Sequence, residues 1–181
     1  MISFRAHKHS DINIGTGSKV RDYSVNFVEF NPFDKKDLGT LKKLSSWEKG
    51  KSLARKICRS AKAELIRGEQ WHKFYGLVEK CDSFEKIQPK KVLGVMDICP
   101  LHERLHELNI IQVNPKDNLF STCRRYTEVG TAMIDSLKTL FPLKDIIVEP
   151  VEDPKVLEFY VKNGFQNIGD GLYKFCAKIK P

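Results

Sequence analysis

The fold is decided by NIIQVNP at residues 109–115 and by RRYTEVGTAMI at residues 124–134. The first segment is rich in apolar and β-branched residues and ends at a proline, a pattern that predicts a strand. In the second segment, apolar residues recur at helical spacing from Glu128 to Leu140, and Pro142 follows them. The sequence therefore predicts a strand, a polar connection and then a helix.

The segments that follow continue this alternation. DIIVEP at 145–150 predicts a short buried strand, and Asp153 with Pro154 predicts the start of a helix that ends at 163–164. LYKFCAKI at 172–179 alternates as a final strand would. A strand, a helix and a second strand in this order favour a parallel crossover connection.

The amino-terminal half also contains strands and helices. We expect three strands, at 23–30, 71–80 and 92–98. The last two could pair antiparallel. Between the first two strands we expect a short helix capped by Asp34 or Asp37, and then an amphipathic basic helix over 49–67.

These elements predict an α/β fold in the broad sense, in which α and β elements share one mixed, mostly antiparallel central sheet flanked by helices on both faces. Residues 1–21 contain GTGSK among polar residues, and we expect them to form a leader or loop extension. Residues 22–181 are expected to form a single domain.

Composition sets the broad class of the chain. Its 181 residues are 41% hydrophobic and 30% charged, proportions that exclude a disordered tail protein, a collagen-like repeat and a disulfide miniprotein. No apolar run approaches the roughly 20 residues that span a bilayer, and no signal-peptide core begins the sequence. We therefore expect a cytoplasmic protein. The five cysteines form no C-x-x-C pair and are expected to be reduced thiols.

The positive charge is concentrated in one segment. Nine lysines and arginines lie between residues 42 and 67 against two glutamates, which accounts for most of the net charge of +8. On the helix expected at 49–67, Lys51, Arg55, Arg59 and Lys62 lie on a different face from the apolar stripe. This basic face is either a solvated surface that aids solubility or a docking surface for a polyanion.

The carboxy-terminal half resembles the GNAT N-acetyltransferases, a family that uses acetyl-coenzyme A (acetyl-CoA). NIIQVNP followed by RRYTEVGTAMI is similar to the family's strand-then-helix unit. Arg125 and Gly130 take the first and last places of its signature Q/R-x-x-G-x-G/A, and Glu128 stands at its middle glycine. DPKVLEFYVKNGF at 153–165 is similar to the family helix N-x-x-A-x-x-F-Y-x-K-x-G-F.

The resemblance implies a GNAT-like acyl-CoA N-acyltransferase fold, with acetyl-CoA as acyl donor and no metal. Independently of the family, the unpaired N–H groups that open a helix form an anion site suited to a diphosphate, and a glycine there allows close approach. The residues implied in cofactor binding lie on the strand, at the start of the helix and at the next helix: Ile111, Gln112, Val113, Arg124, Arg125, Val129, Gly130, Thr131 and Asp153.

The reaction implied is direct attack of a primary amine on the acetyl thioester. A tyrosine at the place of Tyr160 can protonate the departing thiolate, although a packing role for this side chain is the alternative. Asp97 and Glu149 end central strands and are candidates for the base that takes the amine proton, unless a water chain does so or both are structural. In the family, the region that corresponds to the basic helix borders the acceptor site. We therefore expect the acceptor to be acidic or carried on RNA.

Two alternatives remain open. A GNAT-like chain with Glu128 in the signature could be a catalytically degenerate module that binds acyl-CoA or nucleic acid without turnover. His102-Glu103-x-x-His106 matches the H-E-x-x-H signature of zinc peptidases, which need both histidines one helical turn apart. Such a pair is more often an exposed helical turn, and no histidine follows it in the sequence.

Overall fold

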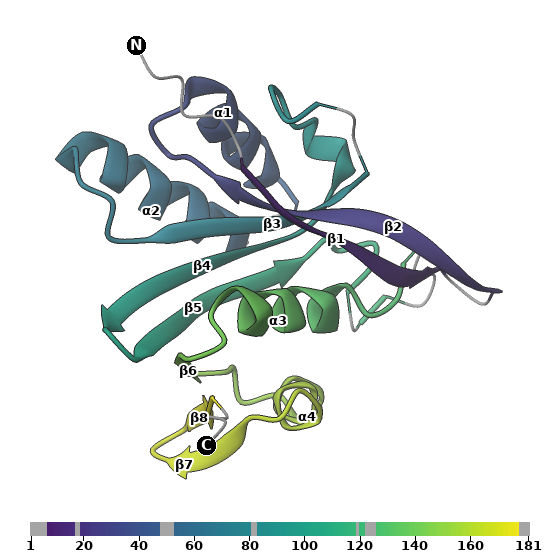
Figure 1. The fold of residues 1–181 in the computed structure, drawn as a ribbon, viewed down its shortest axis with the longest axis vertical. Helices are drawn as coiled ribbons and strands as arrows, with labels where there is room; N and C mark the ends of the chain where they lie inside the picture. Colours follow the sequence, from purple (N-terminus) through teal and green to yellow (C-terminus); the bar gives the residue numbers. More distant parts are fainter. Residues whose placement is uncertain are drawn as a thin grey trace.

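A computed structural model describes residues 7–16, 19–47, 53–80, 83–118, 120–121 and 126–177 of the chain. Eight strands within these ranges form one sheet in the order β1-β2-β3-β4-β5-β6-β8-β7 (Figure 1). All neighbouring strands pair antiparallel except β5 and β6, which are parallel. The strands are β1 (His7–Thr16), β2 (Lys19–Phe30), β3 (Lys73–Glu79), β4 (Val92–His102), β5 (Leu105–Val113), β6 (Asp145–Val148), β7 (Gln166–Gly169) and β8 (Leu172–Phe175).

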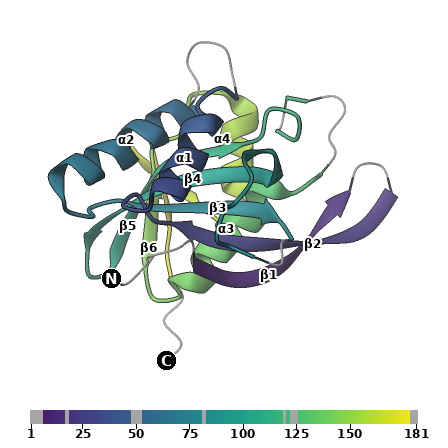
Figure 2. The same cartoon turned by 90° about the horizontal axis from the view of Figure 1, so that it is seen from above.

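The helices cover both faces of this sheet, as Figures 1 and 2 show. Helices α1 and α2 pack on one face over a buried cluster that includes Leu41, Ile57 and Phe74, and α3 packs on the other face over a cluster that includes Met133 and Met96. The elements are α1 (Lys35–Leu44), α2 (Leu53–Arg67), α3 (Val129–Leu140), α4 (Pro154–Lys162) and a 3₁₀ turn at Pro89–Lys91. The prediction of a mixed, mostly antiparallel sheet between helices is confirmed. No helix of the described residues is long and apolar enough to cross a bilayer.

Local capping explains where two of the helices begin. The Asp34 carboxylate accepts hydrogen bonds from the N–H groups of Lys36 and Asp37 at 2.7 and 3.1 Å, so Asp34 is the α1 cap. The Asp153 carboxylate does the same for α4, where Pro154 occupies the first helical position. Of the two caps proposed for α1, Asp37 instead accepts from the Asn31 N–H.

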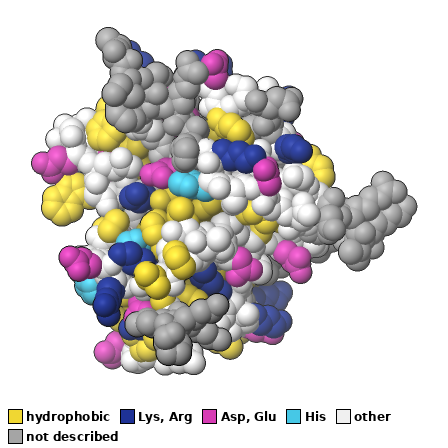
Figure 3. Space-filling view, in the orientation of Figure 1, with side chains coloured by type: hydrophobic (Ala, Val, Ile, Leu, Met, Phe, Trp, Pro, Cys, Tyr) yellow, Lys and Arg dark blue, Asp and Glu magenta, His cyan; other side chains and the backbone are white. Residues whose placement is uncertain are grey.

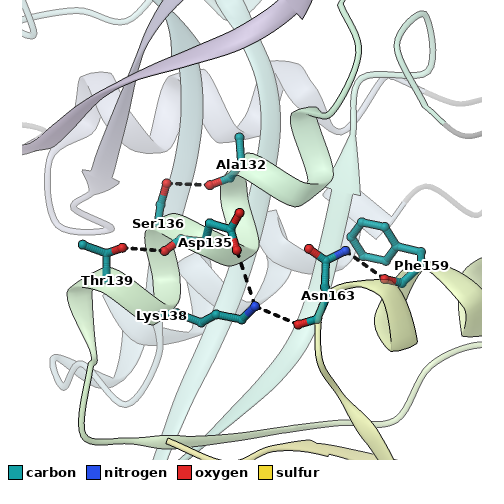
Figure 4. A network of polar contacts seen from close by, with 7 residues as sticks. All are labelled: Ala132, Asp135, Ser136, Lys138, Thr139, Phe159 and Asn163. Carbon is teal, nitrogen blue, oxygen red and sulfur yellow. Dashed lines mark hydrogen bonds and ion pairs between the residues drawn. The ribbon is translucent and has the colours of Figure 1, made fainter. Parts of the chain in front are cut away.

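Helices α3 and α4 are tied together at the end of α3 away from Gly130 (Figure 4). Lys138 Nζ donates to the Asn163 carbonyl oxygen at 2.7 Å and lies 3.4 Å from an Asp135 carboxylate oxygen. The Asn163 side-chain amide in turn donates to the Phe159 carbonyl oxygen at 2.8 Å. These bonds fix the spacing between the two helices without using the opening turn of α3.

Several strands differ from the sequence-based expectation. Residues 7–16, expected in a leader or loop extension, form β1 and pair with β2, and the proposed boundary at residue 22 lies inside β2. Strand β4, expected over 92–98, continues through Pro100 to His102. It can do so because pairing with β3 ends at Ile98, so no strand on that side needs the missing N–H. Strand β7, at the sheet edge and wholly exposed, was not expected.

Candidate functional site: a cleft between two parting strands

Strands β5 and β6 pair only at their first residues. Leu105, His106 and Glu107 align with Asp145, Ile146 and Ile147, and no pairing follows, although β5 runs on to Val113. From residue 108 onward, the β5 edge that faces β6 therefore has no strand partner. Backbone N–H and C=O groups on an unpaired edge are available to a ligand.

A cavity of about 440 Å³, here called the β5–β6 cleft, occupies the space that opens between the strands. It is large enough for an extended small molecule. Its walls come from α2, β5, the opening turn of α3, the residues after β6, and α4. The lining residues are Leu53, Lys56, Asn109, Ile110, Ile111, Gln112, Val113, Asp117, Asn118, Phe120, Glu128, Val129, Gly130, Thr131, Val148, Glu149, Pro150, Val151, Val156, Phe159 and Tyr160.

The opening turn of α3 is one end of this cleft. The first intrahelical bond joins the Ala132 N–H to the Glu128 carbonyl at 2.8 Å, so the N–H groups of residues 129–131 have no partner within the helix. No side chain of the described residues caps them. The uncapped turn is thus a positively polarised site that suits an anion.

Glu128 sits at this turn in a left-handed backbone conformation, with φ of 62°. This conformation favours glycine, which the family signature has at the same place. The Glu128 side chain is exposed and lines the cleft. Its carboxylate adds negative charge at the opening turn of α3.

Gly130 brings α3 close to α4. A Cβ built at this position would lie 3.1 Å from two ring carbons of Phe159 and 3.6 Å from a methyl carbon of Val113. All three residues line the cleft. A larger residue at 130 would therefore push into the cleft or displace the Phe159 ring.

The connection from β5 to α3 is held by side-chain bonds despite its length. The Asp117 carboxylate accepts from the Tyr126 N–H at 3.1 Å, and the Tyr126 hydroxyl donates to Glu79 of β3 at 3.2 Å. These contacts fix the chain just before α3. Arg124 and Arg125, predicted to bind the cofactor, lie outside the described residues.

Gln112 has a structural role in addition to its place on β5. Its side-chain oxygen accepts a hydrogen bond from the Ala54 N–H in the first turn of α2, and the side chain is buried. This bond anchors the first turn of α2 over the carboxy-terminal half of β5. The neighbouring Lys56 side chain is exposed and lines the cleft, so the basic face of α2 reaches the cleft opening.

Tyr160 lines the cleft from α4 and is 4% exposed. Its ring packs edge-on against Phe159 and Phe165, with centroids 5.1 and 5.4 Å away. Burial raises the pKa of the Tyr160 hydroxyl above its usual value of 10, so the group stays protonated at neutral pH. Among the described residues, this hydroxyl has no hydrogen-bond partner, and it is free to donate to a bound group.

The other predicted site residues divide into two groups. Glu149 follows β6, is exposed and lines the cleft together with Ile111, Val113 and Thr131. Asp97 and Asp153 do not line it. The Asp153 carboxylate is used as the cap of α4, and Asp97 of β4 is buried in a hydrogen bond with His72.

The H-E-x-x-H segment does not form a metal site. Residues 102–106 are the tight turn and flanks of the β4–β5 hairpin, so the expectation of an exposed helical turn was wrong. The His102 side chain is exposed, whereas His106 is buried with its ring against Phe141 at 4.5 Å. Within the described ranges, no group of three or more His, Cys, Asp or Glu side chains is arranged to hold a metal ion.

Sequence reasoning missed several lining residues as site residues, among them Lys56, Asn109, Asp117 and Phe159. Phe159 and Lys56 carried a usable signal, since one neighbours Tyr160 and the other lies on the basic helix. Asn109 and Asp117 carried none, because their positions depend on how far β5 and β6 part.

Comparisons with known proteins identify the fold. No family model and no curated protein matches the sequence. Among solved structures, a protein assigned to the GNAT acetyltransferase family from Desulfovibrio desulfuricans is 15% identical, with a TM-score of 0.61 over 85% of this chain and 99% of that one. AtaTR bound with acetyl-CoA is 12% identical, with a TM-score of 0.55 over 83% and 92%.

A third similar structure is AtaT complexed with acetyl-methionyl-tRNA. It is 11% identical, with a TM-score of 0.53 over 84% of this chain and 94% of that one. The chain therefore has the fold of the GNAT acetyltransferases, as its sequence motifs predicted.

Proposed function

We propose that the protein is a GNAT-type N-acetyltransferase that moves an acetyl group from acetyl-CoA to a primary amine. The observation that carries this proposal is the β5–β6 cleft, which joins a free strand edge, the uncapped opening turn of α3 and the Tyr160 hydroxyl. A diphosphate would bind the α3 amides, and the amide-bearing arm of the cofactor would bond along Ile111–Val113. The acetyl group would then lie near the point where the strands part.

The chemistry is direct transfer. The neutral amine nitrogen attacks the thioester carbonyl carbon, and a backbone N–H of β5 stabilises the charge that develops on the carbonyl oxygen. The carbon–sulfur bond then breaks, and the departing thiolate takes a proton from the Tyr160 hydroxyl. Burial raises the pKa of Tyr160, so the hydroxyl carries its proton when the thiolate leaves; the same rise makes it a weaker acid.

Thiol release from acetyl-CoA tests the activity. The acceptor panel comprises spermidine, a lysine-containing peptide and total aminoacyl-tRNA, each over a range of pH. Thiol release with at least one of these amines, together with acetylated product by mass spectrometry, is the expected result. Binding of acetyl-CoA without any amine-dependent release would instead favour the degenerate binding module, for which Glu128 at the α3 turn is the specific observation.

For the acceptor, we propose an amine carried on an acidic molecule such as RNA. Support comes from α2, whose side chains Arg55, Lys56, Arg59 and Lys62 are exposed, with Lys56 at the cleft. AtaT, which shares the fold, was solved with an acetylated aminoacyl-tRNA. On the face that Figure 3 shows, basic and acidic side chains are interspersed. Lys51, the other lysine predicted here, lies outside the described residues.

Charge reversal on α2 tests this acceptor class. The double variant Arg55→Glu/Arg59→Glu should bind total aminoacyl-tRNA at least about tenfold more weakly, since each lost phosphate contact weakens binding and its salt dependence. Acetyl-CoA binding should be unchanged. A matched control is Lys86→Glu/Lys90→Glu, which makes the same change in net charge at exposed positions away from α2 and the cleft. Equal RNA affinity for both double variants would refute the proposed acceptor.

A further inference from the structure

His72 and Asp97 form a hydrogen-bonded pair on the sheet face that α2 covers. His72 lies just before β3, and its Nδ1 is 2.7 Å from an Asp97 carboxylate oxygen on β4. The Asp97 side chain is 1% exposed, whereas that of His72 is 25% exposed. The His72 ring also stacks on Phe74 with an interplanar angle of 9°. The imidazole is therefore held in one orientation with part of the ring open to solvent.

This geometry defines which ring nitrogen is basic. A buried carboxylate accepts hydrogen bonds, so the short contact places the proton on Nδ1 of His72. When the ring is neutral, its lone pair is then on Nε2. A histidine oriented in this way by a carboxylate is the usual arrangement of a general base.

The pair lies beside the point where β5 and β6 part. In the β4–β5 ladder, Asp97 aligns with Ile110 and Ile98 with Leu108, so Asn109 is an extra residue that forms a bulge. The Asn109 amide nitrogen is 3.3 Å from His72 Nδ1, and Asn109 also lines the cleft. Bulges redirect side chains and are frequent beside active sites. With the proton on Nδ1, this approach of two nitrogens is a contact and not a hydrogen bond. Asn109 lies beside the pair and lines the cleft, whereas His72 and Asp97 do not line it.

We propose that His72 is the general base that takes the proton from the acceptor amine, and that Asp97 is the residue that positions it. This inference rests on the N-acetyltransferase function proposed above. One proton passes from the ammonium form of the acceptor to His72 Nε2 and then to solvent. The lone pair freed on nitrogen forms the carbon–nitrogen bond, and the electron pair of the carbon–sulfur bond leaves with sulfur. Sulfur receives a proton from Tyr160. The second proton that the amine loses replaces the one that Tyr160 has given up.

The negative charges around His72 favour its role as the base that accepts the amine proton. Its pKa is raised above 6.5, first by the hydrogen bond to Asp97 and also by the charges of Glu64 on α2 and Glu107 on β5, while burial opposes the rise. Glu64 also accepts from the Trp71 N–H at 2.5 Å, which fixes the chain directly before His72. Burial raises the pKa of the Cys99 thiol of β4, and the charges of the same carboxylates add to the rise, so it remains a neutral thiol. A cationic amine is attracted to such surroundings.

The pH dependence follows from the sign of this shift. A base must be neutral to accept a proton, so kcat/KM should rise with pH through the raised pKa of His72 and level off above it. In Asp97→Asn the negative partner is lost, the pKa of His72 falls, and the rise should move to lower pH at a reduced plateau. In His72→Gln the rise should disappear.

The experiment compares wild type, His72→Gln, Asp97→Asn and the control His102→Gln, an exposed histidine outside the cleft. The amine is the one that gives the highest thiol release with wild type. We expect kcat to fall by about 100-fold in His72→Gln, with KM for acetyl-CoA and its calorimetric affinity unchanged. His72→Ala should recover activity when imidazole is added, which a purely structural histidine would not do.

The outcomes separate this proposal from the one on which it rests. If wild type acetylates the amine and His72→Gln keeps both the rate and the pH profile, His72 is not the base, and the acetyltransferase function stands. If wild type binds no acetyl-CoA, the acetyltransferase function fails and the base assignment with it. Calorimetric binding of acetyl-CoA by each variant shows that the variant is folded, so a lost rate in a variant that still binds reports on the proton transfer.

Discussion

Gly130 of α3 faces the ring of Phe159 of α4 so closely that an added Cβ would lie 3.1 Å from two of the ring carbons. Replacing Gly130 by Leu should fill the cleft beside the α3 amides and weaken acetyl-CoA binding by about 100-fold or more, a loss of about 3 kcal/mol. Calorimetric titration measures the change.

A glycine with open space around it provides the matched control for this variant. Gly39 lies within α1, and nothing would come within 4 Å of its added Cβ. Gly39→Ala should leave acetyl-CoA affinity unchanged and raise the free energy of unfolding by about 0.5–1 kcal/mol, because alanine loses less entropy in a helix. Full affinity in Gly130→Leu would mean that the cofactor does not bind at this turn.

Glu128 offers a substitution that should improve binding. Glu128→Gly keeps the backbone conformation at φ 62° and removes a carboxylate from the anion site. Acetyl-CoA affinity should rise about fivefold at low salt, the effect of the roughly 1 kcal/mol between two charges about 4 Å apart in water. The gain should shrink at high salt because the charges are screened.

Asp170 is the control for backbone strain at Glu128, since it also has a left-handed conformation, with φ of 49°, in the β7–β8 turn. Asp170→Gly should relieve the same kind of strain and leave acetyl-CoA affinity unchanged. An equal affinity gain in both variants would attribute the effect of Glu128→Gly to something other than its charge.

Tyr160→Phe should separate catalysis from binding. We expect kcat to fall by about 100-fold while the acetyl-CoA dissociation constant stays within about twofold, because only the proton donor is removed. Tyr173→Phe changes another buried tyrosine outside the cleft and should keep full activity. Steady-state kinetics with the preferred amine measures both variants. Equal kcat in Tyr160→Phe and wild type would restrict Tyr160 to packing.

Asp37 should make stability depend on pH. Burial raises the pKa of its carboxyl to about 6, with a further rise from Asp34, although the Asn31 N–H acts in the opposite direction. A raised carboxyl pKa means that the folded state binds more protons than the unfolded state between about pH 4 and 6, so stability grows as pH falls through this window.

Asp37→Asn should therefore be more stable than wild type at pH 7.5, by about 1 kcal/mol after allowance for solvent screening and for the lost charge near the helix N-terminus. The difference should vanish below pH 4. Urea unfolding at several pH values measures it, with Glu152→Gln at an exposed position as a control. A gain that is independent of pH would assign the effect to something other than the Asp37 charge.

Periodicity was sufficient to predict most of the fold, and its failures have physical reasons. The helices with apolar stripes and caps, such as α1 after Asp34 and α4 after Asp153, lie where the pattern indicated. Strands β1 and β7 were missed because both are edge strands whose side chains are largely polar or exposed, so they carry little alternation. Their place depends on pairing with β2 and β8, which a local pattern does not contain.

The site was predictable only where it follows the motifs. Val129, Gly130 and Tyr160, singled out from the motifs, line the cleft, and their roles in cofactor binding and catalysis stay predictions. Asp97 was singled out by its place near a strand end, but its partner His72 is 25 residues earlier in the sequence. That pairing follows from the β3–β4 register, in which Phe74 aligns with Asp97. Register is set by the assembled sheet, so it could not be read from either segment alone.

Calorimetric titration of acetyl-CoA into the wild-type protein is the most direct test of the cleft as a cofactor site. The uncapped amides of α3 and the free edge of β5 predict one molecule bound per chain, with a dissociation constant in the micromolar range. No heat of binding at millimolar acetyl-CoA, or equal binding by Gly130→Leu, would contradict the assignment of the β5–β6 cleft.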